Sequence, residues 1–329
     1  MSILACLICK ISPKSDGLQS FIVAVVHRCP IAVAMQIVHT PAGDLTWINI
    51  HEKNNPGACK TKPVNDFKAD FKKLLHLYSD VISYDDTIYK QQKKEMGELG
   101  MICVDMEPAG MATFIHFMGV EDLTYAYYDY PDLFEELADQ FNRAVLQKLE
   151  MALDAKVESI LTGGSGAITL QSPELFKKFS LPTIQKITKM CKEAGTLSGV
   201  HCCGKEYALV ELCANETDLD YINPLEIPPM GDCELAIVKK NFGHKLALMG
   251  NLHTTNVMLF GSVADVRRES LKAIRDAGGD GGFVLSTGDQ CGRDTPFENI
   301  FEMVKVAKEF GTYPLDMDKI VSEIKKLES

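Results

Sequence analysis

Residues 197–251 read LSGVHCCGKEYALVELCANETDLDYINPLEIPPMGDCELAIVKKNFGHKLALMGN, and this stretch decides the fold. Leu197–Cys202, Tyr221–Asn223 and Leu246–Met249 are short apolar runs, which predict buried strands. Glu206–Asn215 and Cys233–Phe242 separate these runs and predict helices. Strands that alternate with helices in this way form parallel βαβ units.

The same alternation continues on both sides of this stretch. Upstream, Ser159–Thr162 predicts a strand that ends at Gly163 and Gly164, and a helix starts at Ser172 and bends near Pro182. A capping box of Thr295 and Glu298 opens the last predicted helix, which stops at Gly311. The other predicted elements are strands at Met101–Met106 and Gly282–Ser286 and helices at Asp66–Leu77, Pro131–Leu153 and Ser262–Ala277.

Polar and glycine-rich residues follow the predicted strands, where the active sites of barrel enzymes lie. The nucleotide-binding patterns G-x-G-x-x-G and G-x-x-x-x-G-K-[ST] are absent, which disfavours an open nucleotide-binding sheet. We therefore predict one α/β domain over residues 1–329, a (β/α)8 TIM barrel with an atypical or incomplete N-terminal part. Residues 1–60 are expected to be irregular, with β-prone runs at Phe21–Val26 and Ile31–Ile37 and a turn at Asn54–Gly57.

Composition excludes several classes of function. The net charge of −11 argues against nucleic acid and against an anionic membrane surface as partners. No apolar run approaches the roughly 18 residues that a membrane-spanning helix needs, and no signal peptide is evident, so we expect a cytoplasmic protein. The 11 cysteines would then remain reduced. Taken singly, most are expected to be small buried side chains: Cys6, Cys9, Cys29, Cys59, Cys103, Cys191, Cys213 and Cys233.

Three other soft side chains follow predicted strands. Side chains alternate along a strand, so His201 and Cys203 should face the same side and Cys202 the other. Cys291 follows the last clear strand and should lie on the same rim. One imidazole and two thiolates match a catalytic zinc site with an open fourth position. The alternative is a set of ordinary buried side chains. A thiol substrate bound to such zinc would be deprotonated, which favours alkyl transfer to sulfur.

Other residues of the same rim are weaker candidates. Glu226 and Asp289 could act as proton acceptors, and Glu226 could also be a fourth zinc ligand, against the alternative that both are rim carboxylates. Asn251, Gly163 and Gly164 follow strands and are the candidates for cofactor binding. We expect Asp105 and Glu107 to be loop carboxylates, His253 a loop histidine, and Arg293 part of a surface salt bridge.

These motifs resemble the uroporphyrinogen decarboxylase superfamily, and within it the branch of methylcobalamin:coenzyme M methyltransferases and related corrinoid-dependent methyltransferases. The resemblance is clearest from Met101 to Pro314. It rests on the following residues: Thr40-Pro41-x-Gly43, Gly163–Gly166, Ser172-Pro173-Glu174, His201-x-Cys203-Gly204, Asn223-Pro224-Leu225-Glu226, Met249-Gly250-Asn251, and Cys291 ahead of Thr295-Pro296-x-Glu298-Asn299.

The resemblance implies a TIM barrel whose zinc is held by His201, Cys203 and Cys291 and activates a thiol acceptor such as coenzyme M. It implies a methyl-corrinoid donor carried by a corrinoid protein; tetrahydrofolate is an alternative acceptor. Two other functions stay open, a metal-free decarboxylase and a non-catalytic corrinoid-binding protein. The decarboxylases hold a polycarboxylate with an N-terminal arginine motif, whereas the first 150 residues here contain only Arg28 and Arg143.

Overall fold

The computed structural model describes residues 3–7, 19–28, 31–52, 57–78, 81, 83–110 and 112–328, with side chains from residue 33 onward. Its central element is a parallel sheet of seven strands in the order β1-β6-β7-β8-β9-β10-β11. Every neighbouring pair in this sheet is parallel. The strands are β1 (Ile3–Leu7), β6 (Gly100–Asp105), β7 (Ser159–Gly163), β8 (Leu197–His201), β9 (Tyr221–Asn223), β10 (Ala247–Leu252) and β11 (Phe283–Thr287).

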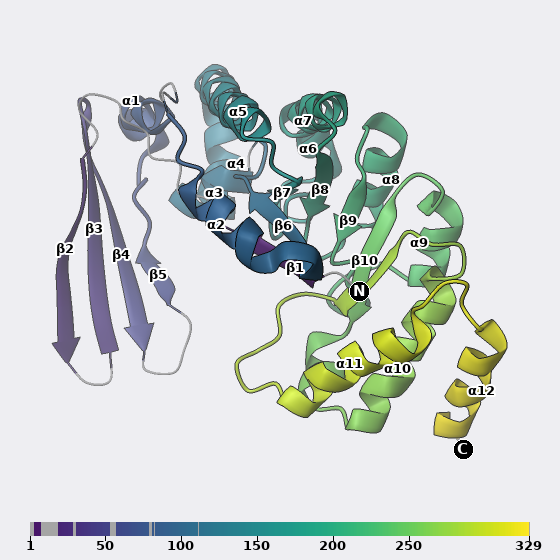
Figure 1. The fold of residues 1–329 in the computed structure, drawn as a ribbon. Coiled ribbons are helices and arrows are strands. Elements are labelled where there is room, and N and C mark those ends of the chain that lie inside the picture. The colour runs from purple at the N-terminus through teal and green to yellow at the C-terminus, as the bar shows by residue number, and fades with distance from the viewer. Residues whose placement is uncertain are drawn as a thin grey trace.

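The sheet curls as a barrel does, and helices cover its outer side (Figure 1). Among the described residues no pairing joins β11 to β1, so the sheet is an open half-barrel. The α/β class predicted from the sequence is confirmed, whereas a closed (β/α)8 barrel is not. The physical reason is the strand count: seven described parallel strands leave the two edges of the sheet unjoined.

The helices predicted after residue 130 are present, and the predicted bend near Pro182 is a break between α6 and α7 at Ser180. The helices at Thr254–Leu259 and Met317–Glu328 were not predicted from the sequence. One local prediction was wrong. Helix α11 begins at Phe297 with Pro296 as its N-cap and no side-chain cap, because the Thr295 side chain is buried. These helices are α5 (Pro131–Asp154), α6 (Pro173–Phe179), α7 (Leu181–Ala194), α8 (Tyr207–Glu216), α9 (Leu235–Phe242), the π-helix η2 (Thr254–Leu259), α10 (Val263–Ala277), α11 (Phe297–Phe310) and α12 (Met317–Glu328).

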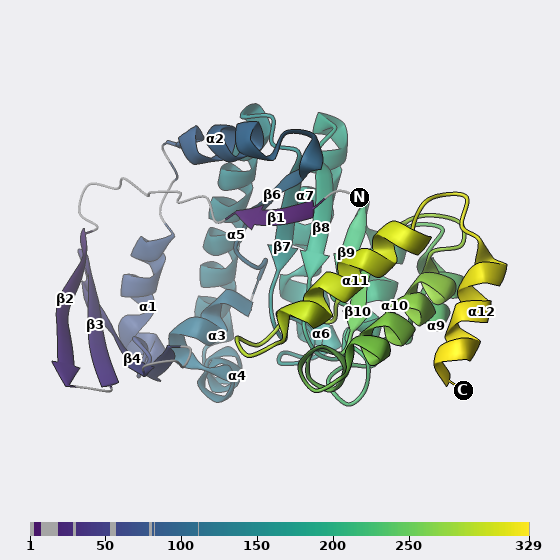
Figure 2. The same cartoon turned by 60° about the horizontal axis from the view of Figure 1, so that its bottom comes forward.

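The N-terminal region is more regular than the sequence predicted. It forms an antiparallel sheet of β2 (Gln19–Arg28), β3 (Ile31–Thr40), β4 (Gly43–Glu52) and β5 (Ala58–Thr61). The prediction that residues 1–60 are irregular was therefore wrong for the part that the structure describes. The two β-prone runs fall in β2 and β3, and the predicted turn falls largely outside the described residues. Figures 1 and 2 both show this sheet at one flank, beyond α1 (Phe67–Leu77).

The two largest buried clusters of the described residues form most of the core. One joins α1, α5 and the short helices before it through Phe114, Phe134 and Phe141; the other lies between β8–β10 and α8–α10. The short elements before α5 are α2 (Thr87–Met96), η1 (Gly97–Leu99), α3 (Ala112–Met118) and α4 (Val120–Asp129). None of the described helices combines the length and the apolar character needed to cross a membrane.

The cysteines follow the expected pattern with one exception. Cys103, Cys191, Cys213 and Cys233 are buried as predicted. Cys59 is exposed, which corrects its prediction; it lies in β5, and neither face of that strand is buried. The side chains of Cys6, Cys9 and Cys29 lie outside the described residues.

Candidate metal centre

The carboxyl ends of β7, β8 and β9 lie side by side. Gly163 pairs with His201, and His201 pairs with Asn223, so the last residues of three strands are in register. Gly163 has φ +97°, and a Cβ at this position would lie 2.2 Å from the His201 carbonyl oxygen. Glycine here therefore lets β7 end close against the histidine.

His201, Cys203 and Asp289 converge at this end of the sheet. His201 Nε2 lies 3.1 Å from Cys203 Sγ, and the Cys203 thiol donates to Asp289 Oδ2 at 3.2 Å. The ligand atoms of all three residues lie within 4.8 Å of one another. Cys202 is fully buried in the core, so the alternation expected along this strand is confirmed.

Cys291 is not part of this group. Its half-buried side chain packs against the core beside β8–β10. Burial raises the pKa of the Cys291 thiol, and the nearby hydroxyls of Thr287 and Thr295 oppose the rise. Asp289, and not Cys291, lies near His201 and Cys203. Thr287 Oγ1 donates to the Asp289 carbonyl at 2.6 Å and closes the turn after β11 that places Asp289 there. Metal binding by Cys291 stays a prediction.

Two neighbouring side chains hold the ligand atoms of His201 and Cys203 in place. His201 Nδ1 lies 2.6 Å from Asn223 Oδ1, an amide oxygen that can only accept, so Nδ1 carries the proton and Nε2 is left to bind. Ser165 Oγ donates to Cys203 Sγ at 3.3 Å. Sequence reasoning missed Asn223 and Ser165; the signal for Asn223 was its position at the end of a strand directly before Pro224.

Glu226 lies next to this group on the segment after β9. The backbone N–H of Gly204, directly after Cys203, donates to Glu226 Oε2. Glu226 is only 6% exposed, so its carboxylate is withdrawn from bulk water. A buried carboxylate in this position can accept a proton from a group bound beside Cys203.

Glu206 is a second buried carboxyl group, which the sequence did not reveal, and it supports the segment that carries Glu226. Glu206 is fully buried, and its Oε1 accepts from the backbone N–H groups of Leu225 and Glu226. Leu225 has φ +61°, a left-handed conformation that is costly for leucine. Burial raises the pKa of Glu206 well above its usual range, against the two backbone donors. Glu206 thus fixes the turn that presents Glu226.

The site is rich in acidic groups. Burial raises the pKa of the Cys203 thiol to about 12, and hydrogen bonding to Asp289 adds to the rise while Ser165 opposes it. Partial removal from water also raises the pKa of Asp105, an effect that His201 opposes and Glu107 increases. An arrangement of thiol and carboxylates with little positive charge suits a bound cation.

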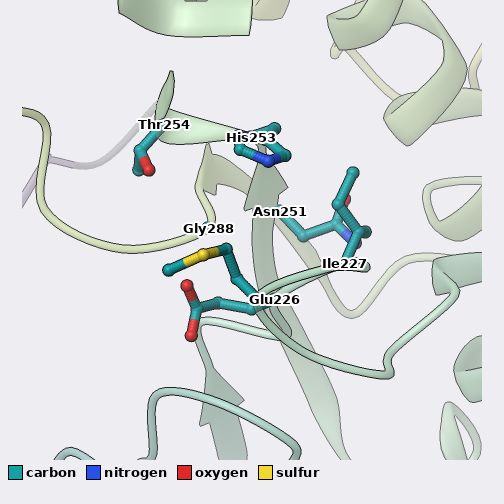
Figure 3. A pocket seen from close by; sticks show the side chains of 7 residues that line it. Glu226, Ile227, Asn251, His253, Thr254 and Gly288 are labelled. Atoms are coloured by element: carbon teal, nitrogen blue, oxygen red, sulfur yellow. The ribbon is translucent and has the colours of Figure 1, made fainter. Parts of the chain in front are cut away.

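A small open pocket adjoins the group. Its lining includes Glu226 from the segment after β9, His253 and Thr254 from the segment after β10, and Gly288 next to Asp289. Figure 3 shows Glu226 facing His253 and Thr254 across this space. Asn251 also lines it and donates to the carbonyls of Leu225 at 3.1 Å and Cys233 at 3.4 Å.

The predicted cofactor-binding residues therefore have visible structural roles. Asn251 ties the end of β10 to the Glu226 segment, and Gly163 allows the close approach of two strands. Gly164 lies against Pro108, because a Cβ placed on Gly164 would be 2.9 Å from Pro108 Cγ. Cofactor binding by these three residues stays a prediction.

Comparison with known proteins places the chain in a family. The model of the family "Uroporphyrinogen decarboxylase (URO-D)" matches residues 61–310. The chain belongs to the uroporphyrinogen decarboxylase family. The uroporphyrinogen decarboxylase of Legionella pneumophila (strain Corby) is 22% identical over an alignment of 282 residues, which covers 81% of this chain and 75% of that protein.

A solved structure supports the same fold. A methyltransferase from Methanosarcina mazei superposes with a TM-score of 0.60 at 20% identity, over 80% of this chain and 74% of that one. The family resemblance seen in the sequence motifs is thus confirmed. The motifs that carry this resemblance extend from Thr40 to Asn299. They include His201 and Cys203, two residues of the candidate metal centre.

Proposed function

We propose that this chain is a zinc-dependent methyltransferase that moves a methyl group from a methyl-corrinoid, carried by a corrinoid protein, to a thiol acceptor. The observation that carries the proposal is the convergence of His201, Cys203 and Asp289, with the buried Glu226 beside them. The methyltransferase branch is supported by the shared fold with the Methanosarcina mazei methyltransferase.

The donor set fits zinc. His201 and Cys203 offer a nitrogen and a sulfur, and the loop after β11 offers either the Cys291 thiol or the Asp289 carboxylate. Such mixed sets with a position left for substrate are typical of catalytic zinc sites. We propose His201, Cys203 and Cys291 as the ligands, because thiolates select zinc over hard cations. When bound, zinc would lower the pKa of the acceptor thiol.

The chain's own residues would prepare the transfer. Asn223 orients His201, Ser165 hydrogen-bonds Cys203, and Glu226 accepts the proton that the acceptor thiol loses. The thiol sulfur forms a bond to the methyl carbon, the carbon–cobalt bond breaks, and its electron pair remains on the corrinoid. Coenzyme M is one candidate acceptor, and tetrahydrofolate is a non-thiol candidate. Asp289 is a second candidate for a proton-accepting role.

The relative from Legionella pneumophila raises a second candidate, decarboxylation of uroporphyrinogen. A substrate with many carboxylates needs arginines or lysines to hold it. The described pocket beside Glu226 has neither among its lining residues, and Arg143 lies instead in a groove between α5 and α7. This argues for methyl transfer over decarboxylation. A corrinoid-binding protein without turnover is the remaining alternative.

Metal content and thiol methylation test the proposal together. The purified chain should hold about one zinc per chain, the stoichiometry of a mononuclear catalytic site, and should demethylate methylcobalamin only with added thiol. Cys203→Ser should lose most of the metal and most of the activity, whereas the neighbouring Cys202→Ser should keep both. Full activity in Cys203→Ser would exclude this site, and bound zinc without turnover would favour the non-catalytic alternative.

A further inference from the structure

The pocket beside the metal centre has a feature that the proposed function does not by itself require. Its lining residues are Glu226, Ile227, Met230, Asn251, His253, Thr254 and Gly288, and none of them is lysine or arginine. The pocket lies next to the metal group, because its lining residue Glu226 accepts from Gly204, the residue after Cys203, and its lining residue Gly288 precedes Asp289. The far end of an acceptor whose sulfur lies at the metal would therefore come close to these residues, which Figure 3 shows.

The one histidine of the lining is uncharged in this arrangement. The backbone N–H groups of Thr255 and Asn256 both donate to His253 Nδ1, each at 3.1 Å. A nitrogen that accepts two hydrogen bonds holds no proton, so the ring is neutral. His253 is therefore no counter-ion for an anion.

Lys205 and Arg293, the basic residues closest in the chain to Cys203 and Cys291, do not supply a counter-ion either. Arg293 Nη2 pairs with Asp294 Oδ2 at 2.9 Å, and both side chains are exposed, as the sequence predicted. Lys205 is exposed, and it is not among the lining residues of the pocket. Among the residues that the structure describes, the charges at the pocket are thus carboxylates, from Glu226 at its wall and Asp289 next to Gly288.

From this charge pattern we infer that the acceptor is a small thiol with an uncharged or cationic far end, and not one with a sulfonate or carboxylate. An anionic group in a pocket walled by a buried carboxylate would be repelled and would lose its hydration without a partner. The inference rests on the proposed function and narrows its acceptor, because it disfavours coenzyme M.

A matched series of thiols tests the inference. 2-Aminoethanethiol, 2-mercaptoethanol and 2-mercaptoethanesulfonate share the HS–CH2–CH2 unit and differ only in the charge of the far end. With zinc-loaded protein and methylcobalamin, kcat/KM for the first two should exceed that for the sulfonate by about tenfold or more, the scale expected for a like-charge contact in a desolvated site. Calorimetric binding of the three S-methyl products should follow the same order, which gives a readout independent of turnover.

A charge introduced into the pocket should reverse the preference. Met230 lines the pocket and is 56% exposed, so Met230→Lys can place an ammonium group there without disturbing the core. We expect this variant to favour the sulfonate over the amine. Ile237→Lys adds the same charge on the exposed face of α9, outside the pocket, and should leave the order unchanged.

The outcomes separate the two proposals. If the chain methylates thiols and prefers the sulfonate, the inference about the acceptor is wrong and the proposed function stands. If Met230→Lys and Ile237→Lys behave alike, the pocket does not set the charge preference, and the inference fails in the same way. If no thiol is methylated by zinc-loaded protein, both proposals fail.

Discussion

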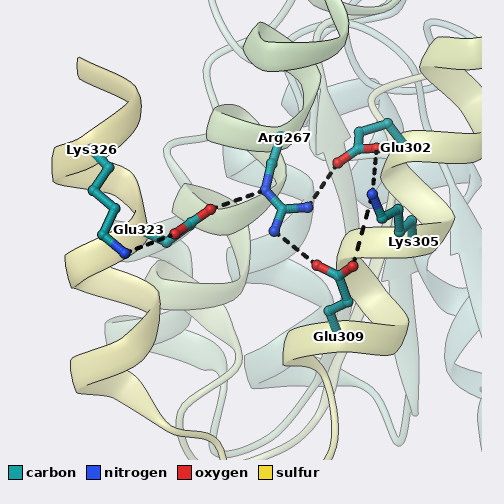
Figure 4. A network of polar contacts seen from close by, with 6 residues as sticks. All are labelled: Arg267, Glu302, Lys305, Glu309, Glu323 and Lys326. Carbon is teal, nitrogen blue, oxygen red and sulfur yellow. Dashed lines mark hydrogen bonds and ion pairs between the residues drawn. The ribbon is translucent and has the colours of Figure 1, made fainter. Parts of the chain in front are cut away.

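Two charged regions of this chain are built on opposite principles. At the corner of α10, α11 and α12, Arg267 binds three glutamates: Glu302 and Glu309 at 2.8 Å each, and Glu323 at 3.3 Å. Lys305 lies between Glu302 and Glu309, and Lys326 lies beside Glu323. Figure 4 shows this closed network, in which each glutamate contacts two cations.

At the carboxyl ends of the strands, the described acidic groups are not balanced by cationic side chains in this way. Glu226 is buried and accepts a hydrogen bond from the backbone N–H of Gly204, not from a cationic side chain, and Asp289 accepts from the Cys203 thiol. Removing one partner from charges that are paired within the fold is destabilising, whereas acidic groups without a cationic partner favour the binding of a cation. The comparison indicates that the charges of the corner are balanced within the fold, whereas the strand ends can take up a cation.

The largest expected effect sharpens the ligand set at the strand ends. We expect Cys291→Ser to lower zinc affinity by more than the roughly 10- to 100-fold that is typical of removing an outer-shell partner. Asp289→Asn should stay within that range, because we propose Asp289 as a neighbour of the ion and Cys291 as its ligand. Competition with a chromophoric chelator measures both affinities.

The reverse order would show that the arrangement of His201, Cys203 and Asp289 is also that of the loaded site. His244→Ala is a suitable control, because His244 lies in the turn after α9, outside the lining of the pocket. Its zinc affinity should equal that of the unchanged chain.

A smaller effect is expected at the corner. Arg267→Ala removes three ion pairs at once and leaves Glu302 largely buried without its nearest cation. Because the arginine side chain is still 18% exposed, we expect a loss of about 1–2 kcal/mol of unfolding free energy, between the values for surface and buried pairs. Denaturant unfolding measures the loss.

Zinc content and thiol methylation should be unchanged in Arg267→Ala, which is the point of the comparison. Arg268→Ala serves as the control, since its partners Asp265 and Glu269 lie on the same helix and remain near water. A loss of zinc in Arg267→Ala would show that the two regions are coupled.

The two regions also differ in how far the sequence could predict them. Most strands and helices from Ser159 to Gly311 are short apolar runs and amphipathic segments, and some have clear caps, such as the capping box of Ser262 and Asp265, so their local pattern suffices. The pair of His201 and Cys203 follows from alternation along one strand. These features depend only on neighbours in the chain.

What the sequence did not reveal depends on partners far along the chain. Asn223 contacts His201 only because β8 and β9 are in register, and Glu206 supports residues 19 and 20 positions later. Arg267 on α10 reaches the glutamates of α11 and α12 only because these three helices pack together. The N-terminal sheet likewise depends on pairing between whole strands, which composition alone does not fix.

The smallest expected effect concerns Glu206 and its dependence on pH. Its pKa is raised in the fold by burial, so the folded chain binds this proton more tightly than the unfolded chain does. Stability from this group is therefore present in acid and is lost as pH rises above the ordinary glutamate pKa. Glu206→Gln keeps an oxygen for the Leu225 and Glu226 N–H groups but cannot ionise.

We expect Glu206→Gln to match the unchanged chain near pH 5 and to exceed its unfolding free energy at pH 8 by about 1 kcal/mol or more, the equivalent of roughly one unit of pKa shift. Denaturant unfolding at the two pH values gives the difference. Glu206→Ala, which removes the acceptor, should be destabilised at both. If Glu206→Gln instead lost stability at pH 8, the carboxylate would be ionised in the fold, and the strand ends would hold still more uncompensated negative charge than the comparison assumes.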